Sequence, residues 1–155
     1  MHFKNIEDVL DLAITKEEEA ATFYRDVSSN EKVQDIRQMF LDFAAEEDKH
    51  KTLLLQLKSG IMDQTVDEYD WSWIIDLKRS NYVDDIEYRP GMPYNEILIM
   101  AAQREEKALA FYNECLSGAK GDEMKKVFKM LCQEEAKHKL ALEDMLDRFM
   151  AEMGD

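Results

Sequence analysis

One pattern of residues occurs twice in this sequence, and each residue of the first copy returns 88 positions later. In both copies a glutamate precedes a Glu-x-x-His tetrad by thirty residues: Glu17 with Glu47 and His50, then Glu105 with Glu135 and His138. Other residues repeat at the same spacing, namely Ala20 and Ala108, Phe23 and Phe111, Tyr24 and Tyr112, Phe40 and Phe128, and Lys49 and Lys137. The sequence therefore predicts a helical hairpin that is present twice.

Apolar residues recur at alternating steps of three and four, and only five glycines and two prolines interrupt the 155 residues. This periodicity is typical of helices. We predict an all-α protein with one domain over residues 1–155, folded as an antiparallel four-helix bundle with helical hairpins over 5–59 and 93–153. Gly60 can end the second helix in a left-handed conformation, and Pro93 can open the third.

The connection between the hairpins, residues 60–92, is too long for a hairpin turn. A connection of this length lets the chain travel along the bundle, so that the third helix starts parallel to the second. A short helix is expected within residues 66–78. We expect Trp71 and Trp73 to cover a bundle edge or a dimer contact rather than to bind a cofactor.

Composition restricts the function classes. A net charge of -14 repels phosphate backbones and attracts divalent cations, although an acidic surface also serves solubility alone. Cys115 and Cys132 form no Cys-x-x-Cys pair, so these residues cannot build a zinc knuckle or a rubredoxin-like iron site. The sequence has no apolar signal core and no membrane-length apolar run. We therefore expect a cytoplasmic protein that binds neither nucleic acid nor membrane.

The repeated glutamates and histidines lie on the apolar stripes of the predicted helices, where a bundle usually carries leucine. Four carboxylates and two imidazoles therefore face the interior. Burying charged carboxylates without partners costs several kcal/mol each, and a whole domain is stable by only about 5–15 kcal/mol. Two divalent cations would balance four carboxylates if the imidazoles bind as neutral ligands.

Chain lengths place these side chains at one level of the bundle. The path from Glu17 to a turn near Asn30 is about 13 residues, or ~20 Å of helix, and the path back to Glu47 matches it once the turn is subtracted. A spacing of three also places the Glu and His of each tetrad on one helix face. A single Glu-x-x-His tetrad is as easily a surface pair. Two tetrads with matching upstream glutamates favour a two-metal site.

At these residues the chain resembles the rubrerythrin branch of the ferritin-like proteins. The resemblance rests on EEEAATFY at 17–24, EEKALAFY at 105–112, EEDKH at 46–50 and EEAKH at 134–138. It implies a ferritin-like bundle with two iron ions, for which manganese or zinc remain alternatives. By the same resemblance the six residues have three roles: Glu47 and Glu135 bridge both ions, Glu17 and Glu105 are terminal ligands, and His50 and His138 bind one ion each.

Four further residues are candidates for contacts to these ligands. Tyr24 and Tyr112 follow the terminal glutamates by two turns on the same face, where a phenol can hydrogen-bond a ligand carboxylate; ordinary core tyrosines are the alternative. Metal-bound histidines usually donate their second N–H to a carboxylate. Glu46 and Glu134 are candidates for that carboxylate, with solvated glutamates as the alternative.

The sequence departs from rubrerythrins in two respects. Full-length rubrerythrins carry a C-terminal rubredoxin-like domain, and this sequence shows none, so an external electron donor is expected. They also carry an additional glutamate one turn after the terminal ligand of the third helix, where this chain has Ala108. The symmetric ligand set resembles bacterioferritin-type ferroxidase sites more closely.

Three functions remain open at this stage. The first is a di-iron oxidoreductase that reacts Fe(II) with hydrogen peroxide or dioxygen, as a peroxidase or a ferroxidase. The second is an iron-binding, sequestering protein without sustained turnover. The third is a bundle whose metal only stabilises the fold, because one fold hosts many functions. A homodimer is expected from the resemblance and from the aromatic connection.

Overall fold

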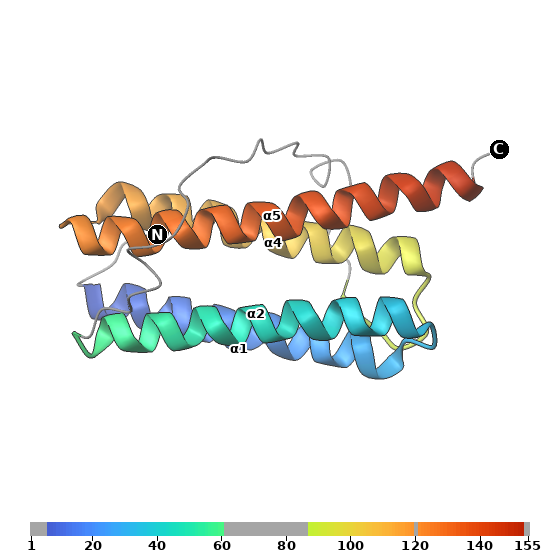
Figure 1. The fold of residues 1–155 in the computed structure, drawn as a ribbon, viewed down its shortest axis with the longest axis horizontal. Coiled ribbons are helices and arrows are strands. Elements are labelled where there is room, and N and C mark those ends of the chain that lie inside the picture. Colours follow the sequence, from blue (N-terminus) through green and yellow to red (C-terminus); the bar gives the residue numbers. More distant parts are fainter. Residues whose placement is uncertain (1–5, 61–86, 120, 154–155) are drawn as a thin grey trace.

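The computed structural model describes residues 6–60, 87–119 and 121–153, which form four helices and no strand within these ranges. The helices are α1 (Ile6–Asn30), α2 (Gln34–Lys58), α4 (Tyr94–Gly118) and α5 (Asp122–Met153). As Figure 1 shows, α1 and α2 run antiparallel in one layer, and α4 and α5 run antiparallel in the other. The predicted all-α four-helix bundle is confirmed. No helix in the described ranges has an apolar stretch long enough to cross a membrane.

The helix ends follow the local sequence signals. Gly60 has a φ of 82° just after α2, and Gly121 has a φ of 91° just before α5; both are left-handed conformations that favour glycine. Pro93 stands immediately before α4 and its carbonyl accepts the amide N–H of Ile97 at 3.1 Å. The turn between α1 and α2 is held by Glu31, whose carboxylate accepts the next two amide N–H groups, each at 3.0 Å.

The directions of α2 and α4 confirm the predicted path of the connection between the two hairpins. In Figure 1, α2 ends at one end of the bundle and α4 begins at the opposite end, so the two helices run parallel. Residues 61–86 lie outside the described ranges, and with them the predicted short helix at 66–78 and the two tryptophans. Tyr88, just after this segment, packs edge-on against Phe23 of α1 with ring centroids 5.9 Å apart.

The apolar core consists of two clusters, one toward each end of the bundle. Along α1, the first cluster contains Val9, Leu10 and Ala13, and the second contains Phe23, Tyr24 and Val27. Along α5, Phe128 and Leu131 belong to the first and Leu142 to the second. Between the clusters these helices bury polar side chains, Glu17 on α1 and Glu135 and His138 on α5. The core is therefore divided by a polar layer, which holds the candidate site.

Candidate metal centre

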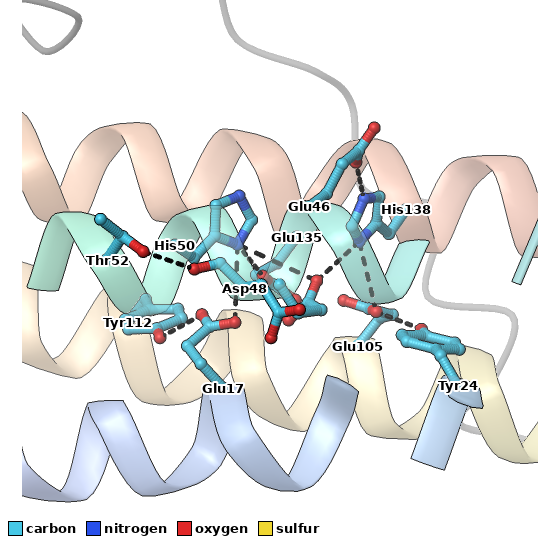
Figure 2. A network of polar contacts seen from close by, with 11 residues as sticks. Glu17, Tyr24, Glu46, Asp48, His50, Thr52, Glu105, Tyr112, Glu135 and His138 are labelled. Carbon is cyan, nitrogen blue, oxygen red and sulfur yellow. Dashed lines mark hydrogen bonds and ion pairs between the residues drawn. The ribbon is translucent and has the colours of Figure 1, made fainter. Parts of the chain in front are cut away.

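All six predicted ligands are buried in this polar layer and point toward one another, as Figure 2 shows for the five that it labels. Each is at most 5% exposed. We call Glu17 of α1 and Glu105 of α4 the terminal pair, Glu47 of α2 and Glu135 of α5 the shared pair, and His50 of α2 and His138 of α5 the histidine pair. Each helix thus contributes to one site, and each tetrad directs both of its side chains inward because residues three apart share a helix face.

The six side chains form two overlapping groups that could each hold a metal ion. One group is Glu17, Glu47, His50 and Glu135, and the other is Glu47, Glu105, Glu135 and His138. Within each group one ligand atom per residue lies within 4.8 Å of all the others. Both groups contain Glu47 and Glu135. A carboxylate has two oxygen atoms, so each member of the shared pair can face both positions at once.

All six candidate ligands have a buried polar atom that makes no hydrogen bond. Each of the six leaves one buried atom without a hydrogen-bond partner: Oε2 of Glu17 and Glu105, Oε1 of Glu47 and Glu135, and Nδ1 of His50 and His138. Buried polar atoms of this kind are rare in native proteins, and an ion is a common explanation. All six are lone-pair donors of the type that iron, manganese and zinc accept. The residues present therefore fit a two-metal centre.

The charges of the cluster act against one another. Burial and the charge of Glu105 raise the pKa of both members of the shared pair well above the usual range of a glutamate. Burial also acts to raise the pKa of Glu17 and Glu105, but histidine and hydrogen-bonding neighbours lower it overall. Four carboxylates this close cannot all ionise cheaply without a nearby cation, so bound cations would stabilise the cluster.

Comparison with known proteins places this site in a family. Residues 8–84, which include the first hairpin and one copy of the ligand set, match the Rubrerythrin family model. The protein belongs to the rubrerythrin-type, ferritin-like family. No curated protein matches the sequence.

Two solved structures share the ferritin-like fold of this rubrerythrin-type chain. One is a Thermotoga maritima protein provisionally described as a ferritin-like diiron-carboxylate protein; it is 22% identical, with a TM-score of 0.71, over 95% of this chain and 97% of its own. The other is a hypothetical protein from Pyrococcus furiosus, 22% identical, with a TM-score of 0.68, over 93% of this chain and 89% of its own. At this identity the likeness concerns the fold.

Both candidate tyrosines of the rubrerythrin-type centre contact a terminal glutamate, but each contacts that of the other hairpin. The Tyr112 hydroxyl donates to Oε1 of Glu17 at 2.5 Å, and the Tyr24 hydroxyl donates to Oε1 of Glu105. Burial, followed by the charge of the bonded glutamate, raises the pKa of each phenol well above its usual value. Both tyrosines therefore remain protonated donors. Spacing along one helix did not reveal that these contacts cross the bundle.

The two candidate outer glutamates differ. Glu46 is hydrogen-bonded to Nε2 of His138, and this contact is the first cause of the lowered pKa of Glu46. Its equivalent, Glu134, contacts neither histidine within the described ranges and lies 3.9 Å from Lys137, one turn further along α5. Of the two interpretations left open for Glu134, its contact with Lys137 fits the solvated glutamate rather than the carboxylate that supports a histidine.

Phe43 is a site residue that the sequence analysis did not single out. Its ring stacks on the imidazole of His138 with centroids 4.5 Å apart and planes inclined by 25°. The available signal was a break in the repeat, because the equivalent position, 88 residues later, is Leu131.

Neither cysteine belongs to a ligand group. Both thiols are buried, and burial raises the pKa of each to about 12. Cys132 contacts the side chain of Asn113, with Sγ 3.5 Å from Oδ1. These thiols are packing groups that stay protonated at neutral pH.

Proposed function

We propose that this protein is a di-iron carboxylate oxidoreductase that reduces hydrogen peroxide or dioxygen at the buried centre. The observation that carries the proposal is the pair of overlapping ligand groups, in which each of the six residues directs one otherwise unpartnered atom inward. Two iron ions held by these six residues would supply two electrons: with two protons from solvent, these would convert hydrogen peroxide to two water molecules, or dioxygen to hydrogen peroxide, while both Fe(II) ions become Fe(III). Hard carboxylate ligands favour the ferric state that results.

The roles of the ligands follow from their place in the two groups. Glu47 and Glu135, which occur in both, would bridge the two metal positions. Glu17 with His50 would complete one position, and Glu105 with His138 the other. The four negative charges of the carboxylates balance the four positive charges of two divalent ions when the imidazoles are neutral, so the loaded centre would have no net charge.

The tyrosines determine which oxygen of each terminal glutamate is available. Tyr112 occupies Oε1 of Glu17 and Tyr24 occupies Oε1 of Glu105, which leaves Oε2 of each glutamate for the metal. The phenol protons stay in place because their pKa is raised. Phe40 and Phe128 are fully buried beside the tyrosines and help to exclude water from this layer. Electrons for repeated turnover must come from a donor outside the bundle.

An anaerobic iron titration followed by oxidation tests this function. Purified protein should bind two Fe(II) ions per chain, and hydrogen peroxide should produce the near-ultraviolet absorption of ferric iron in a carboxylate site. With an added electron donor, peroxide consumption should continue over many cycles. A protein that binds iron but oxidises it once per loading is an iron-sequestering protein, and this result would reject the catalytic proposal. Occupancy by redox-inert zinc alone, with no iron oxidation, would reject both.

Glu47→Ala serves as the loss-of-site variant, because it removes a ligand from both groups. The matched control is Glu18→Ala, which removes a half-exposed glutamate of α1 that pairs with Lys51 at 3.0 Å outside the centre. The control should retain two iron ions per chain and full peroxide consumption, while Glu47→Ala loses both.

A further inference from the structure

Around the terminal pair, Glu17 and Glu105, residues at equivalent positions of the repeat make equivalent contacts. The two tyrosine contacts cross between the hairpins in the same way. Two cation contacts cross likewise: Lys16 lies 5.1 Å from the ring centroid of Phe111, and its equivalent Arg104 lies 4.3 Å from that of Phe23. The terminal glutamates therefore occupy matched environments.

Around the histidine pair, residues at equivalent positions of the repeat make different contacts. His138 is hydrogen-bonded through Nε2 to Glu46 and stacks against Phe43. At the equivalent positions around His50 the chain has Glu134, which lies beside Lys137, and Leu131, which has no ring. No described residue accepts a hydrogen bond from Nε2 of His50. The two imidazoles are thus chemically identical ligands with different supports.

The ligand nitrogens themselves are placed alike. Nδ1 of His138 lies 3.0 Å from Glu47 and 3.4 Å from Glu105, and Nδ1 of His50 lies 3.2 Å from Glu135 and 3.5 Å from Glu17. Because a carboxylate only accepts, the Glu46 contact keeps a proton on Nε2 of His138 and leaves Nδ1 as the ligand atom. The same contact makes the imidazole a stronger ligand, and the Phe43 ring restricts its rotation.

We propose that Glu46 and Phe43 are positioning residues that make the two metal positions unequal. The position of His138 fills first and holds its ion, while the position of His50 fills second and exchanges its ion faster. This inference rests on the two-metal binding in the proposed function, and it requires no redox activity. Glu46 belongs to the first hairpin and supports a histidine of the second, so the support of the His138 position depends on both hairpins.

Titration with Co(II), followed by visible absorption and calorimetry, measures both affinities without turnover. The unaltered chain should bind two ions in two resolved steps. In Glu46→Ala the tighter step should weaken by about 10–100-fold, which is the usual cost of removing a partner of a metal-bound histidine. The equivalent variant, Glu134→Ala, is the matched control and should leave both steps in place. Phe43→Leu, which copies the residue at 131, should weaken the tighter step by less than Glu46→Ala.

A second readout identifies the histidine concerned. In the zinc-loaded protein, nuclear magnetic resonance should detect a slowly exchanging Nε2–H on His138 and a fast one on His50. Glu46→Ala should make the His138 proton exchange as fast as that of His50, with circular dichroism confirming an unchanged helix content.

The outcomes separate the two proposals. Two ions bound with equal affinity, or equal effects of Glu46→Ala and Glu134→Ala, would overturn the unequal positions and leave the di-iron function standing. Fewer than two ions per chain would overturn the di-metal function and, with it, this inference. Two unequal steps without iron oxidation would overturn the oxidoreductase and retain the inequality.

Discussion

The two hairpins carry the same candidate ligands in different surroundings. Lys51 and Glu18 form an ion pair at 3.0 Å on the first hairpin, and their equivalents Lys139 and Glu106 lie 3.3 Å apart on the second. The first pair is exposed, with side chains 35% and 51% accessible, whereas the second is 1% and 17% accessible. One sequence motif has therefore become a solvated contact in one half and a buried charge pair in the other.

This difference shows what a repeat specifies. It specifies which residue type occupies each helical position, and it leaves the environment of that position to the rest of the chain. At the candidate metal centre the two ligand groups match in residue type, because all four helices contribute to them. Away from the centre each hairpin has its own neighbours. The comparison predicts that equivalent substitutions act alike at the shared pair and at the two tyrosines, whose contacts match in both halves. Equivalent substitutions around the histidine pair and at the two lysine–glutamate pairs should differ, because those surroundings differ.

The largest expected effect is at the shared pair. Glu47→Ala and Glu135→Ala each remove a ligand from both groups, so either variant should lose both metal ions. Glu17→Ala removes a ligand from one group, so it should retain about one ion. The number of metal ions bound per chain, measured for each variant at the same free metal concentration, tests this prediction. Retention of one ion in Glu47→Ala would show that the two positions do not share this carboxylate.

A large effect on stability is expected at the buried lysine. Lys139→Met removes one partner of a buried pair, which should cost about 3–5 kcal/mol in the free energy of unfolding. Lys51→Met removes the equivalent partner of the exposed pair and should cost less than about 1 kcal/mol. Urea unfolding of both variants tests the comparison directly. Similar costs would mean that the difference in burial has no energetic consequence.

An intermediate and equal effect is expected at the two tyrosines. Tyr24→Phe and Tyr112→Phe each remove one hydrogen bond to a buried carboxylate, worth about 1.5–3 kcal/mol. The two costs should agree, because the contacts cross the bundle symmetrically. Urea unfolding of the metal-free protein measures them. A cost confined to one variant would show that only one of the terminal glutamates depends on its phenol.

The smallest effect is expected at the cysteines, where the second hairpin differs from the first. Cys115 stands at the position equivalent to Val27, and Cys132 at that equivalent to Ala44. Replacing each cysteine by its counterpart should cost less than about 1.5 kcal/mol and leave metal binding intact, because neither thiol belongs to a ligand group.

The folded protein should also resist alkylation by iodoacetamide at pH 8, since burial raises both thiol pKa values to about 12. Fast alkylation of the native protein, at the rate of a free thiol, would contradict this assignment.

The sequence by itself determined the helices, the repeat and the six inward-facing candidate ligands. Helical periodicity places Glu47 and His50 on one stripe whatever surrounds them, and a spacing of thirty residues brings Glu17 to the same level. The same periodicity could not show that Tyr24 reaches Glu105, that Glu46 supports His138, or that Lys139 is buried while Lys51 is not.

Those features depend on how the four helices are rotated and spaced against one another. Packing of whole faces decides that geometry, and the period of a single helix does not contain it. The residues of the centre could therefore be predicted from the sequence alone. The unequal support of the two histidines depends on how the two hairpins pack against each other, which only the tertiary structure shows.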